Sequence, residues 1–244
     1  MNRQNEPYDA RQYAKSKKLP FREAVEWHTI RKLLGEVAGL SVVDAGCGDG
    51  IYSRRLIDLG AESVIGIDGS QDFIDLAVNK GKGYLKKVQY GCSLIQDSQG
   101  DGTNRLVVGS YILSYPRSLE EAIRYCQAIA SHLKTGGRFV GFNNNPFQTF
   151  EGLEGGDYLK YGFLKQMHGD REGSEVLYLL EGMSDIITNY YLSPETYQEA
   201  FKQAGFREFN WVPIELDPEV QDKEFWKDFF AGQPPFIAMT AVKG

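Results

Sequence analysis

The sequence predicts a doubly wound α/β fold, a Rossmann-like sheet of seven mostly parallel strands. Apolar runs of strand length alternate with segments of helix length, most regularly over residues 40–145. That alternation is typical of parallel βαβ units. A glycine-rich turn also follows the first apolar run, at the place where such folds open a ligand crevice.

The predicted elements of this core follow one another in order. Leu40–Asp44 (LSVVD) is a strand entering the glycine-rich turn, and Ile51–Leu59 is a helix with one apolar face. Val64–Asp68 is the second strand, and Asp72–Asn79 is the second helix with Ser70 at its N-cap. Further strands are expected at Lys87–Cys92, Leu106–Ile112 and Gly137–Asn143, with a helix at Leu119–Leu133.

Two segments lie outside the alternating core. Residues 1–35 are expected to form a helical lid, with a break at Pro20. Residues 147–192 are expected to form an inserted cap, in which EVLYLLEG and DIITNYYL read as a hairpin. We refer to these segments as the lid and the cap.

The last part of the chain returns to the sheet. Ser193 is expected to cap a helix that has Pro194 at its first position, and closing strands are expected at Phe206–Val212 and Pro235–Val242. We therefore predict one domain over residues 1–244.

Composition narrows the classes of function. The 244 residues include 27 Lys and Arg against 33 Asp and Glu, which gives a net charge of -6. That charge argues against binding to nucleic acid or to anionic lipid. The apolar runs are too short to span a membrane. We therefore expect a small-molecule partner, while the oligomeric state stays open.

The cysteines, the histidines and the N-terminal residues bear on metal binding and on the cellular location. Three cysteines and three histidines stand at spacings that match no zinc or disulfide pattern, so no metal is assigned. The N-terminal residues lack the apolar stretch of a signal peptide. These features predict a cytoplasmic protein.

The sharpest motif is VVDAGCGDG, residues 42–50. Gly46, Gly48 and Gly50 let the backbone turn sharply and let a ligand approach closely. Asp68 follows about 20 residues past the loop, where a carboxylate accepts hydrogen bonds from ribose hydroxyls. The motif therefore predicts a nucleoside cofactor.

Charge decides between the cofactors. The spacing G-x-G-x-G differs from the dinucleotide pattern G-x-G-x-x-G, and Asp44 and Asp49 stand where a pyrophosphate would lie. Each like-charge contact at about 4 Å would cost roughly 4 kcal/mol at an effective dielectric constant near 20. The two acids suit a cation, and S-adenosylmethionine supplies both a sulfonium and an ammonium.

These residues resemble the class I S-adenosylmethionine-dependent methyltransferases, whose acidic glycine-loop motif is matched by Asp44, Gly46, Gly48 and Gly50. The resemblance implies that Asp68 is the acid that binds the ribose. The predicted cofactor-binding residues are Asp44, Gly46, Cys47, Gly48, Gly50, Asp68, Gly69, Ser93, Leu94, Ser110, Tyr13 and Arg22.

Further blocks resemble a small-molecule branch of that family, which includes the N-methyltransferase of toxoflavin biosynthesis. They include YDARQY, SKKLPFREAVEWHT, GSYILSY, LKTGGRFVGFNNNP and NYYLSPETYQEAFKQAGF. Family members often carry an Asp after the third strand for the adenine amino group, but this chain has Cys92, Ser93 and Leu94 there. The Ser93 hydroxyl, a backbone carbonyl or Asp97 are the alternatives.

Methyl transfer depends more on aligning the acceptor atom with the methyl group of the donor than on a catalytic motif. Asn143, Asn144 and Asn145 end the fifth strand, where amides suit a heterocycle with ring nitrogens, although a hydrogen-bonded turn before Pro146 is the alternative. Tyr115 follows the fourth strand and is expected to contact the acceptor.

Lid residues are further candidates. The resemblance implies that Tyr8 and Tyr13 lie in a helix over the cofactor. We expect Tyr13 to reach the methionine end or the acceptor, Tyr8 to contact the acceptor, and Arg22 to pair with the methionine carboxylate. A solvated helix face is the alternative for Tyr13 and Arg22. His28 is a candidate general base, with a packed or exposed histidine as the alternative.

The cap contributes aromatic candidates. Tyr161 and Tyr190 are expected to stack on a planar acceptor, with an ordinary core position as the alternative. The predicted catalytic group comprises His28, Tyr13, Asn143 and Asn144.

The sequence thus predicts an enzyme that methylates N or O of a small, planar heterocyclic or aromatic molecule. A nicotinamide-dependent oxidoreductase is one alternative, because it shares the glycine turn and the ribose acid. A non-catalytic regulator that binds S-adenosylmethionine is the other.

Overall fold

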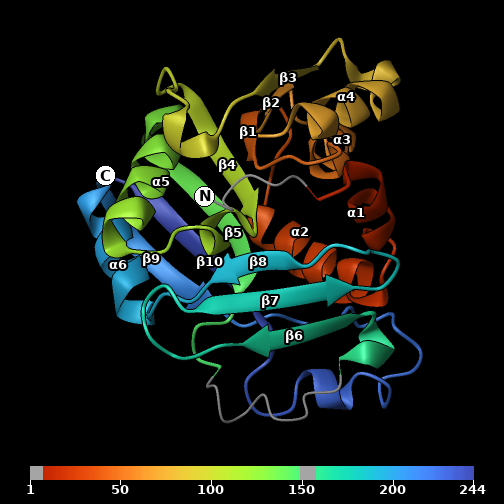
Figure 1. Cartoon of the computed structure of the whole chain (residues 1–244). Helices are drawn as coiled ribbons and strands as arrows, with labels where there is room; N and C mark the ends of the chain where they lie inside the picture. Colours follow the sequence, from red (N-terminus) through yellow and green to blue (C-terminus); the bar gives the residue numbers. More distant parts are fainter. Residues whose placement is uncertain (1–7, 149–157) are drawn as a thin grey trace.

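The computed structural model describes residues 8–148 and 158–244 (Figure 1). Predictions for residues 1–7 of the lid and 149–157 of the cap lie outside the described residues. The central strands are β1 (Ser41–Ala45), β2 (Ser63–Asp68), β3 (Val88–Cys92), β4 (Asn104–Ser110), β5 (Leu133–Asn144), β9 (Phe206–Val212) and β10 (Phe236–Lys243).

These seven strands form one sheet in the order β3-β2-β1-β4-β5-β10-β9. Strands β1 to β5 are parallel, and β10 runs antiparallel to both β5 and β9. The predicted fold class is therefore confirmed. Strand β5 begins at Leu133, four residues before the predicted start, and follows its helix directly.

Helices cover both faces of this sheet. They are α1 (Ala10–Ser16), the π-helical segment η2 (Arg22–Trp27), α2 (His28–Leu34), α3 (Ile51–Asp58), α4 (Gln71–Lys80), α5 (Leu119–His132) and α6 (Pro194–Gln203). Adjacent residues on the strands point to opposite faces. Val42 accordingly packs in a core cluster with Leu34 and Leu56, whereas Val43 packs in another with Ile129 and Phe201.

Two predicted helix starts differ in their side-chain chemistry. The Ser193 hydroxyl accepts from the Thr196 amide at the start of α6, as expected of an N-cap. Ser70 occupies the N-cap position of α4 but forms no capping bond through its side chain. Instead, its amide donates to Oδ1 of Asp68 at 3.0 Å.

The cap forms an antiparallel sheet of three strands, β6 (Phe163–Met167), β7 (Glu175–Leu180) and β8 (Ile187–Tyr190). The predicted hairpin is the β7–β8 pair. Sequence reasoning missed strand β6, because its middle inward position is Lys165 while Leu164 faces outward. That arrangement hides the alternation by which a half-buried strand is recognised.

The cap lies at the end of the central sheet toward which β4 and β5 point (Figure 1). The Tyr178 hydroxyl on β7 donates to Oδ1 of Asn144 at 2.7 Å, and Nδ2 of Asn144 donates to Oδ1 of Asn189 at 3.3 Å. These bonds attach the cap to the carboxyl end of β5. A ligand crevice of an open α/β sheet is expected at this edge.

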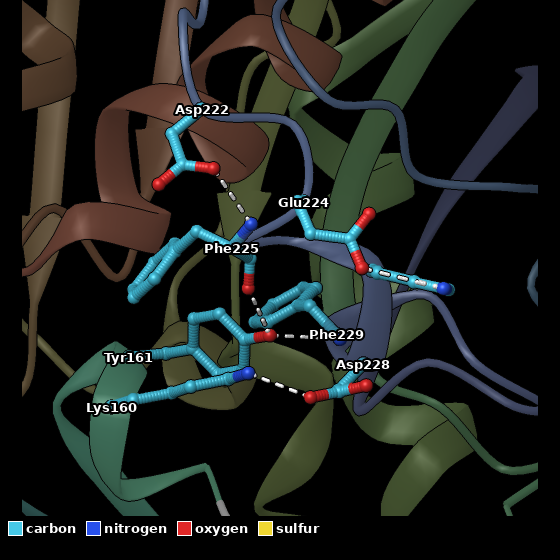
Figure 2. A network of polar contacts seen from close by, with 8 residues as sticks. Lys160, Tyr161, Asp222, Glu224, Phe225, Asp228 and Phe229 are labelled. Carbon is cyan, nitrogen blue, oxygen red and sulfur yellow. Dashed lines mark hydrogen bonds and ion pairs between the residues drawn. The ribbon is translucent and has the colours of Figure 1, made fainter.

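Tyr161 lies in the core and not at a ligand surface. Its side chain is 0% exposed, and its hydroxyl donates to the Phe225 carbonyl at 2.8 Å and accepts from the Phe229 amide at 3.0 Å. Figure 2 shows this network, in which neighbouring Lys160 pairs with Asp228. Tyr161 is therefore not available to contact an acceptor, because its ring is packed in the core and its hydroxyl is bonded to the backbone.

We expect Tyr161→Phe to lower the free energy of unfolding by about 1–3 kcal/mol, because it removes the hydrogen bonds to the Phe225 carbonyl and from the Phe229 amide. Chemical denaturation followed by circular dichroism measures the change. Lys160→Ala is the matched control, since it removes only exposed contacts, the ion pair with Asp228 and the approach of its ammonium to the Tyr161 and Phe225 rings, and should leave the unfolding midpoint nearly unchanged. Equal midpoints for Tyr161→Phe and the wild type would contradict this role.

No helix among the described residues combines the length and the apolar character needed to cross a lipid bilayer.

Candidate functional site

The glycine loop connects β1 to α3 and is fastened to β2. Gly46, Gly48 and Gly50 all have positive φ angles, of 73°, 54° and 72°, a region that side chains rarely adopt. A Cβ added at Gly48 would meet nothing nearer than 3.9 Å. The loop therefore offers open space beside its central glycine, which fits close approach by a ligand.

Asp68 is fixed by two backbone amides at the end of β2. Its Oδ2 accepts from the Gly48 amide at 2.9 Å, and its Oδ1 accepts from the Ser70 amide at 3.0 Å. Burial raises the pKa of this carboxyl, although the two amide bonds oppose that shift. Each oxygen keeps a further lone pair, so the carboxylate fits the two hydroxyls of a ribose.

The residues after β3 lie beside the same loop. The Ser93 amide donates to the Asp68 carbonyl at 2.9 Å, and the Ser93 hydroxyl donates to the Leu94 carbonyl at 3.1 Å. The Leu94 side chain packs against Gly69, where a Cβ would collide with it. This edge offers an apolar side chain and backbone groups to an adenine, while Asp97 is exposed on the following turn.

The two acids of the loop differ in their partners. Asp44 is 1% exposed and accepts from the Ser53 hydroxyl at 2.6 Å. Burial raises its pKa to about 6, against the opposing effects of the Ser53 bond and the charge of Lys17. Oδ2 of Asp49 instead pairs with Lys80 at 2.6 Å. Asp44 is thus the acid of this pair that can respond to a bound cation.

Cys47 is a packing residue of the loop. Its side chain is 5% exposed, and its thiol lies 3.8 Å from the Gly48 carbonyl. Burial raises the pKa of this thiol, so it stays protonated and chemically quiet.

Sequence reasoning missed the buried carboxylate of Glu26, which is 0% exposed. It accepts hydrogen bonds from Arg22, from the hydroxyls of Tyr52 and Tyr111, and from Ser110 at 3.3 Å. Burial opposes ionisation, but the charge of Arg22 leaves the pKa of Glu26 lowered. The i, i+4 spacing of Arg22 and Glu26 is the sequence signal that could have indicated this pair.

A cavity lies between the lid, the cap and the ends of β4 and β10. We call it cavity 1. It brings together four residues predicted from the sequence, namely Tyr8, Tyr13, Arg22 and Tyr115. The other lining residues are Phe21, Tyr111, Tyr178, Leu180, Ile187, Asn189 and Phe236.

Cavity 1 adjoins the glycine loop through aromatic contacts. The rings of Tyr8 and Tyr13 lie 5.1 Å apart and both pack edge-on against Phe73, with centroid distances of 5.7 and 5.5 Å. Phe73 is also the residue nearest to the open side of Gly48. Burial raises the pKa of both Tyr8 and Tyr115, whose hydroxyls share a hydrogen bond of 3.1 Å.

The three predicted asparagines do not line cavity 1. Asn143 bonds Ser114 and Tyr197, and Asn144 bonds the cap. Asn145 donates to the Pro234 carbonyl at 2.8 Å and accepts from the Phe147 amide at 3.0 Å, which is the hydrogen-bonded turn named above as the alternative. The amides therefore hold the end of β5 in place.

A second cavity, cavity 2, contains the predicted residue Tyr190 together with Asn144 and Asn145. The Tyr190 ring lies under the guanidinium of Arg117 at 4.6 Å. Lys165 also lines this cavity and donates to Gln148 at 2.6 Å and to the Pro235 carbonyl at 3.0 Å. Tyr190 is therefore separate from the residues that meet at cavity 1.

His28 is not among the residues that line either cavity. Its Nδ1 lies 3.7 Å from Oδ2 of Asp217, on the side of the lid that contacts the segment after β9. The general base expected at this position is therefore not supported by the geometry. The reason is that η2 and α2 form one continuous helical stretch, in which residues 22 and 28 face different directions.

Comparison with known proteins agrees with this geometry. Residues 42–137 match a family described as methyltransferase domain. The chain is 29% identical to the ubiquinone biosynthesis O-methyltransferase of Bordetella avium over 139 residues, 55% of either protein. It is 36% identical to the ribosomal protein L11 methyltransferase of Burkholderia cenocepacia over 102 residues, 42% of this chain and 31% of that protein. The match thus spans about half or less of these relatives.

Solved structures share the fold over nearly the whole chain. An S-adenosylmethionine-dependent methyltransferase from Clostridium acetobutylicum superposes with a TM-score of 0.67 at 15% identity, covering 96% of this chain and 98% of that one. One from Mesorhizobium loti gives 0.62 at 20% identity, covering 89% and 97%. The chain thus has the fold of solved S-adenosylmethionine-dependent methyltransferases, and the predicted enzyme class and cofactor agree with the match of residues 42–137 to a methyltransferase domain.

Ionisation of Asp44 should control cofactor affinity. We expect the affinity for S-adenosylmethionine to rise as the pH increases from 5 to 7, because the carboxyl with a pKa of about 6 becomes an anion facing a cation. Asp44→Asn should remove this dependence and weaken binding at pH 7.5 by about tenfold, or about 1.4 kcal/mol. Calorimetric titration at several pH values measures both effects.

A stability measurement separates this effect from misfolding. Because burial raises the folded-state pKa of Asp44, its contribution to stability declines as the pH rises from about 4 through 6. Asp44→Asn should therefore be at least as stable as the wild type at pH 7.5. A pH-dependent affinity that persists in Asp44→Asn would show that another group titrates.

Proposed function

We propose that this protein is an S-adenosylmethionine-dependent methyltransferase that methylates N or O of a small, planar aromatic or heterocyclic molecule. The observation that carries the proposal is the aromatic cavity 1, which adjoins the glycine loop through Tyr8, Tyr13 and Phe73. Donor and acceptor would then meet beneath one layer of lid side chains. Such proximity is the main requirement of an in-line methyl transfer.

The donor side is supported by its fit to S-adenosylmethionine. Asp68 would bind the ribose, Asp44 would face the cationic methionine end, and Leu94 would contact the adenine. The bound cofactor supplies an activated methyl group. The residues of this chain bind it, orient it and exclude water from it.

The acceptor side is supported by the chemistry of cavity 1. Most of its lining residues are Phe or Tyr, besides Arg22 and the aliphatic and amide side chains, and aromatic walls favour a planar ring. The toxoflavin-like blocks and the ubiquinone O-methyltransferase relative agree with a small acceptor. The net charge of -6 gives no support to an RNA acceptor of the kind named for the tRNA U34 carboxymethyltransferase relative of Methylococcus capsulatus.

Alignment would dominate over base catalysis. Burial raises the pKa of the cavity tyrosines Tyr8, Tyr111 and Tyr115, so their hydroxyls remain protonated donors. Arg22 stays cationic beside them because it is paired with the buried Glu26, and it lines cavity 1 as a polar group that can orient the acceptor.

Two other functions make different predictions. A nicotinamide-dependent oxidoreductase would bind NADH, but the buried Asp44 and Asp49 of the loop disfavour its pyrophosphate. A non-catalytic regulator would bind S-adenosylmethionine without releasing S-adenosylhomocysteine when acceptors are added. Screening planar acceptors for stoichiometric release of S-adenosylhomocysteine separates the enzyme from the regulator.

Asp68→Ala tests the donor assignment. We expect it to weaken the binding of S-adenosylmethionine and S-adenosylhomocysteine by more than tenfold, since the ribose loses its acceptor and the loop loses the bond from Gly48. Calorimetry with NADH in parallel measures selectivity. The exposed Asp72 on α4 provides the control Asp72→Ala, which should bind as the wild type does. Unchanged affinity in Asp68→Ala would rule out this site.

Ile187→Trp tests the acceptor assignment. Ile187 is 7% exposed and lines cavity 1, so an indole there should fill the space and raise the KM for the acceptor at least tenfold. Affinity for S-adenosylmethionine should change less than twofold. The neighbouring Ile186 is 58% exposed, and Ile186→Trp is therefore the matched control. A normal KM in Ile187→Trp would place the acceptor elsewhere.

A further inference from the structure

Lys17 is a cation at the border between the lid and the glycine loop. It follows directly after α1, and its ammonium lies 4.9 Å from the ring centroid of Tyr13 and 5.8 Å from that of Tyr52. Its side chain is half-buried. Within residues 8–148 and 158–244, no hydrogen bond or ion pair of this ammonium is present.

The two rings beneath Lys17 connect it to the cofactor loop. Tyr13 packs edge-on against Phe73, the residue beside the open face of Gly48. Tyr52 lies in the first turn of α3, directly after the loop, and donates to the buried Glu26. The ammonium is therefore held over aromatic faces next to the loop, where a cation is stabilised but not neutralised.

Three buried or half-buried carboxyls are affected by this charge. Burial is the largest effect on the pKa of Asp44, Asp68 and Glu26, and it raises the pKa in each. The positive charge of Lys17 lowers the pKa of all three carboxyls. Lys17 bonds to none of them, and each has other partners. A cation with no anionic partner thus faces the same region as the acids of the loop.

The methionine end of S-adenosylmethionine carries a sulfonium, an ammonium and one carboxylate. The acids of the loop suit the two cations, but the carboxylate requires a positive partner. Arg22, the residue expected for this role, donates to Glu26 and stacks against Tyr111 at 5.1 Å and Phe21 at 4.6 Å. Its charge is already neutralised, whereas that of Lys17 is not.

We propose that Lys17 binds the α-carboxylate of the methionine part of S-adenosylmethionine. This inference rests on the proposed function, since it requires that donor. It assigns Arg22 to the wall of cavity 1 and to Glu26.

Calorimetric titration of the full chain with three ligands tests the proposal. S-adenosylmethionine and S-adenosylhomocysteine carry the carboxylate, and decarboxylated S-adenosylmethionine lacks it. The wild type should bind the first two at least tenfold more tightly than the third. Lys17→Met should weaken the binding of the first two by at least tenfold, leave that of the decarboxylated ligand within twofold, and so abolish the preference. Lys17→Arg should retain it.

The neighbouring Lys18 is exposed, so Lys18→Met is the control for a general change of charge and should keep the wild-type preference. The proposal is overturned if Lys17→Met keeps that preference, or if it weakens all three ligands equally. Failure of the wild type to bind any of the three would instead overturn the proposed function itself. Circular dichroism of each variant verifies that the fold is intact.

Discussion

The buried carboxylate of Glu26 is the contact on which the arrangement of this site depends. Its partners come from the lid through Arg22, from α3 through Tyr52, and from the end of β4 through Ser110 and Tyr111. A buried anion costs several kcal/mol to desolvate and is tolerated only when its partners are well placed. This requirement holds the π-helical segment of the lid against the edge of the sheet that carries the glycine loop and cavity 1.

The same contact explains why the glycine loop and cavity 1 are neighbours. Tyr52 begins the helix after the glycine loop, while Arg22 and Tyr111 line cavity 1. Tyr13 lies between the two regions, because it lines the cavity, packs against Phe73 and lies beneath Lys17. A shift of the lid would therefore alter the donor site and the acceptor cavity together, as an enzyme that aligns two reactants requires.

The features that can be predicted from the sequence are those that depend on residues close together in the chain. The glycine loop and Asp68 are predictable because positive φ angles demand glycine and because the acid follows the loop at a fixed spacing. Strand β6 escapes prediction because Lys165 occupies its inward position. The last two residues of β5, Asn143 and Asn144, fit an acceptor site by their chemistry, but their amides are occupied by Ser114, Tyr197 and the cap.

The sequence by itself determined the βαβ order, the glycine loop with its acid, and the net negative charge, because these depend on the order and type of residues along the chain. Only the tertiary structure decided which aromatic side chains line a cavity and which, like Tyr161, belong to the core. It also decided that Arg22 bonds Glu26 while Lys17 faces the loop. Such choices depend on contacts between segments far apart in the chain, where burial and pairing of charges outweigh local preference.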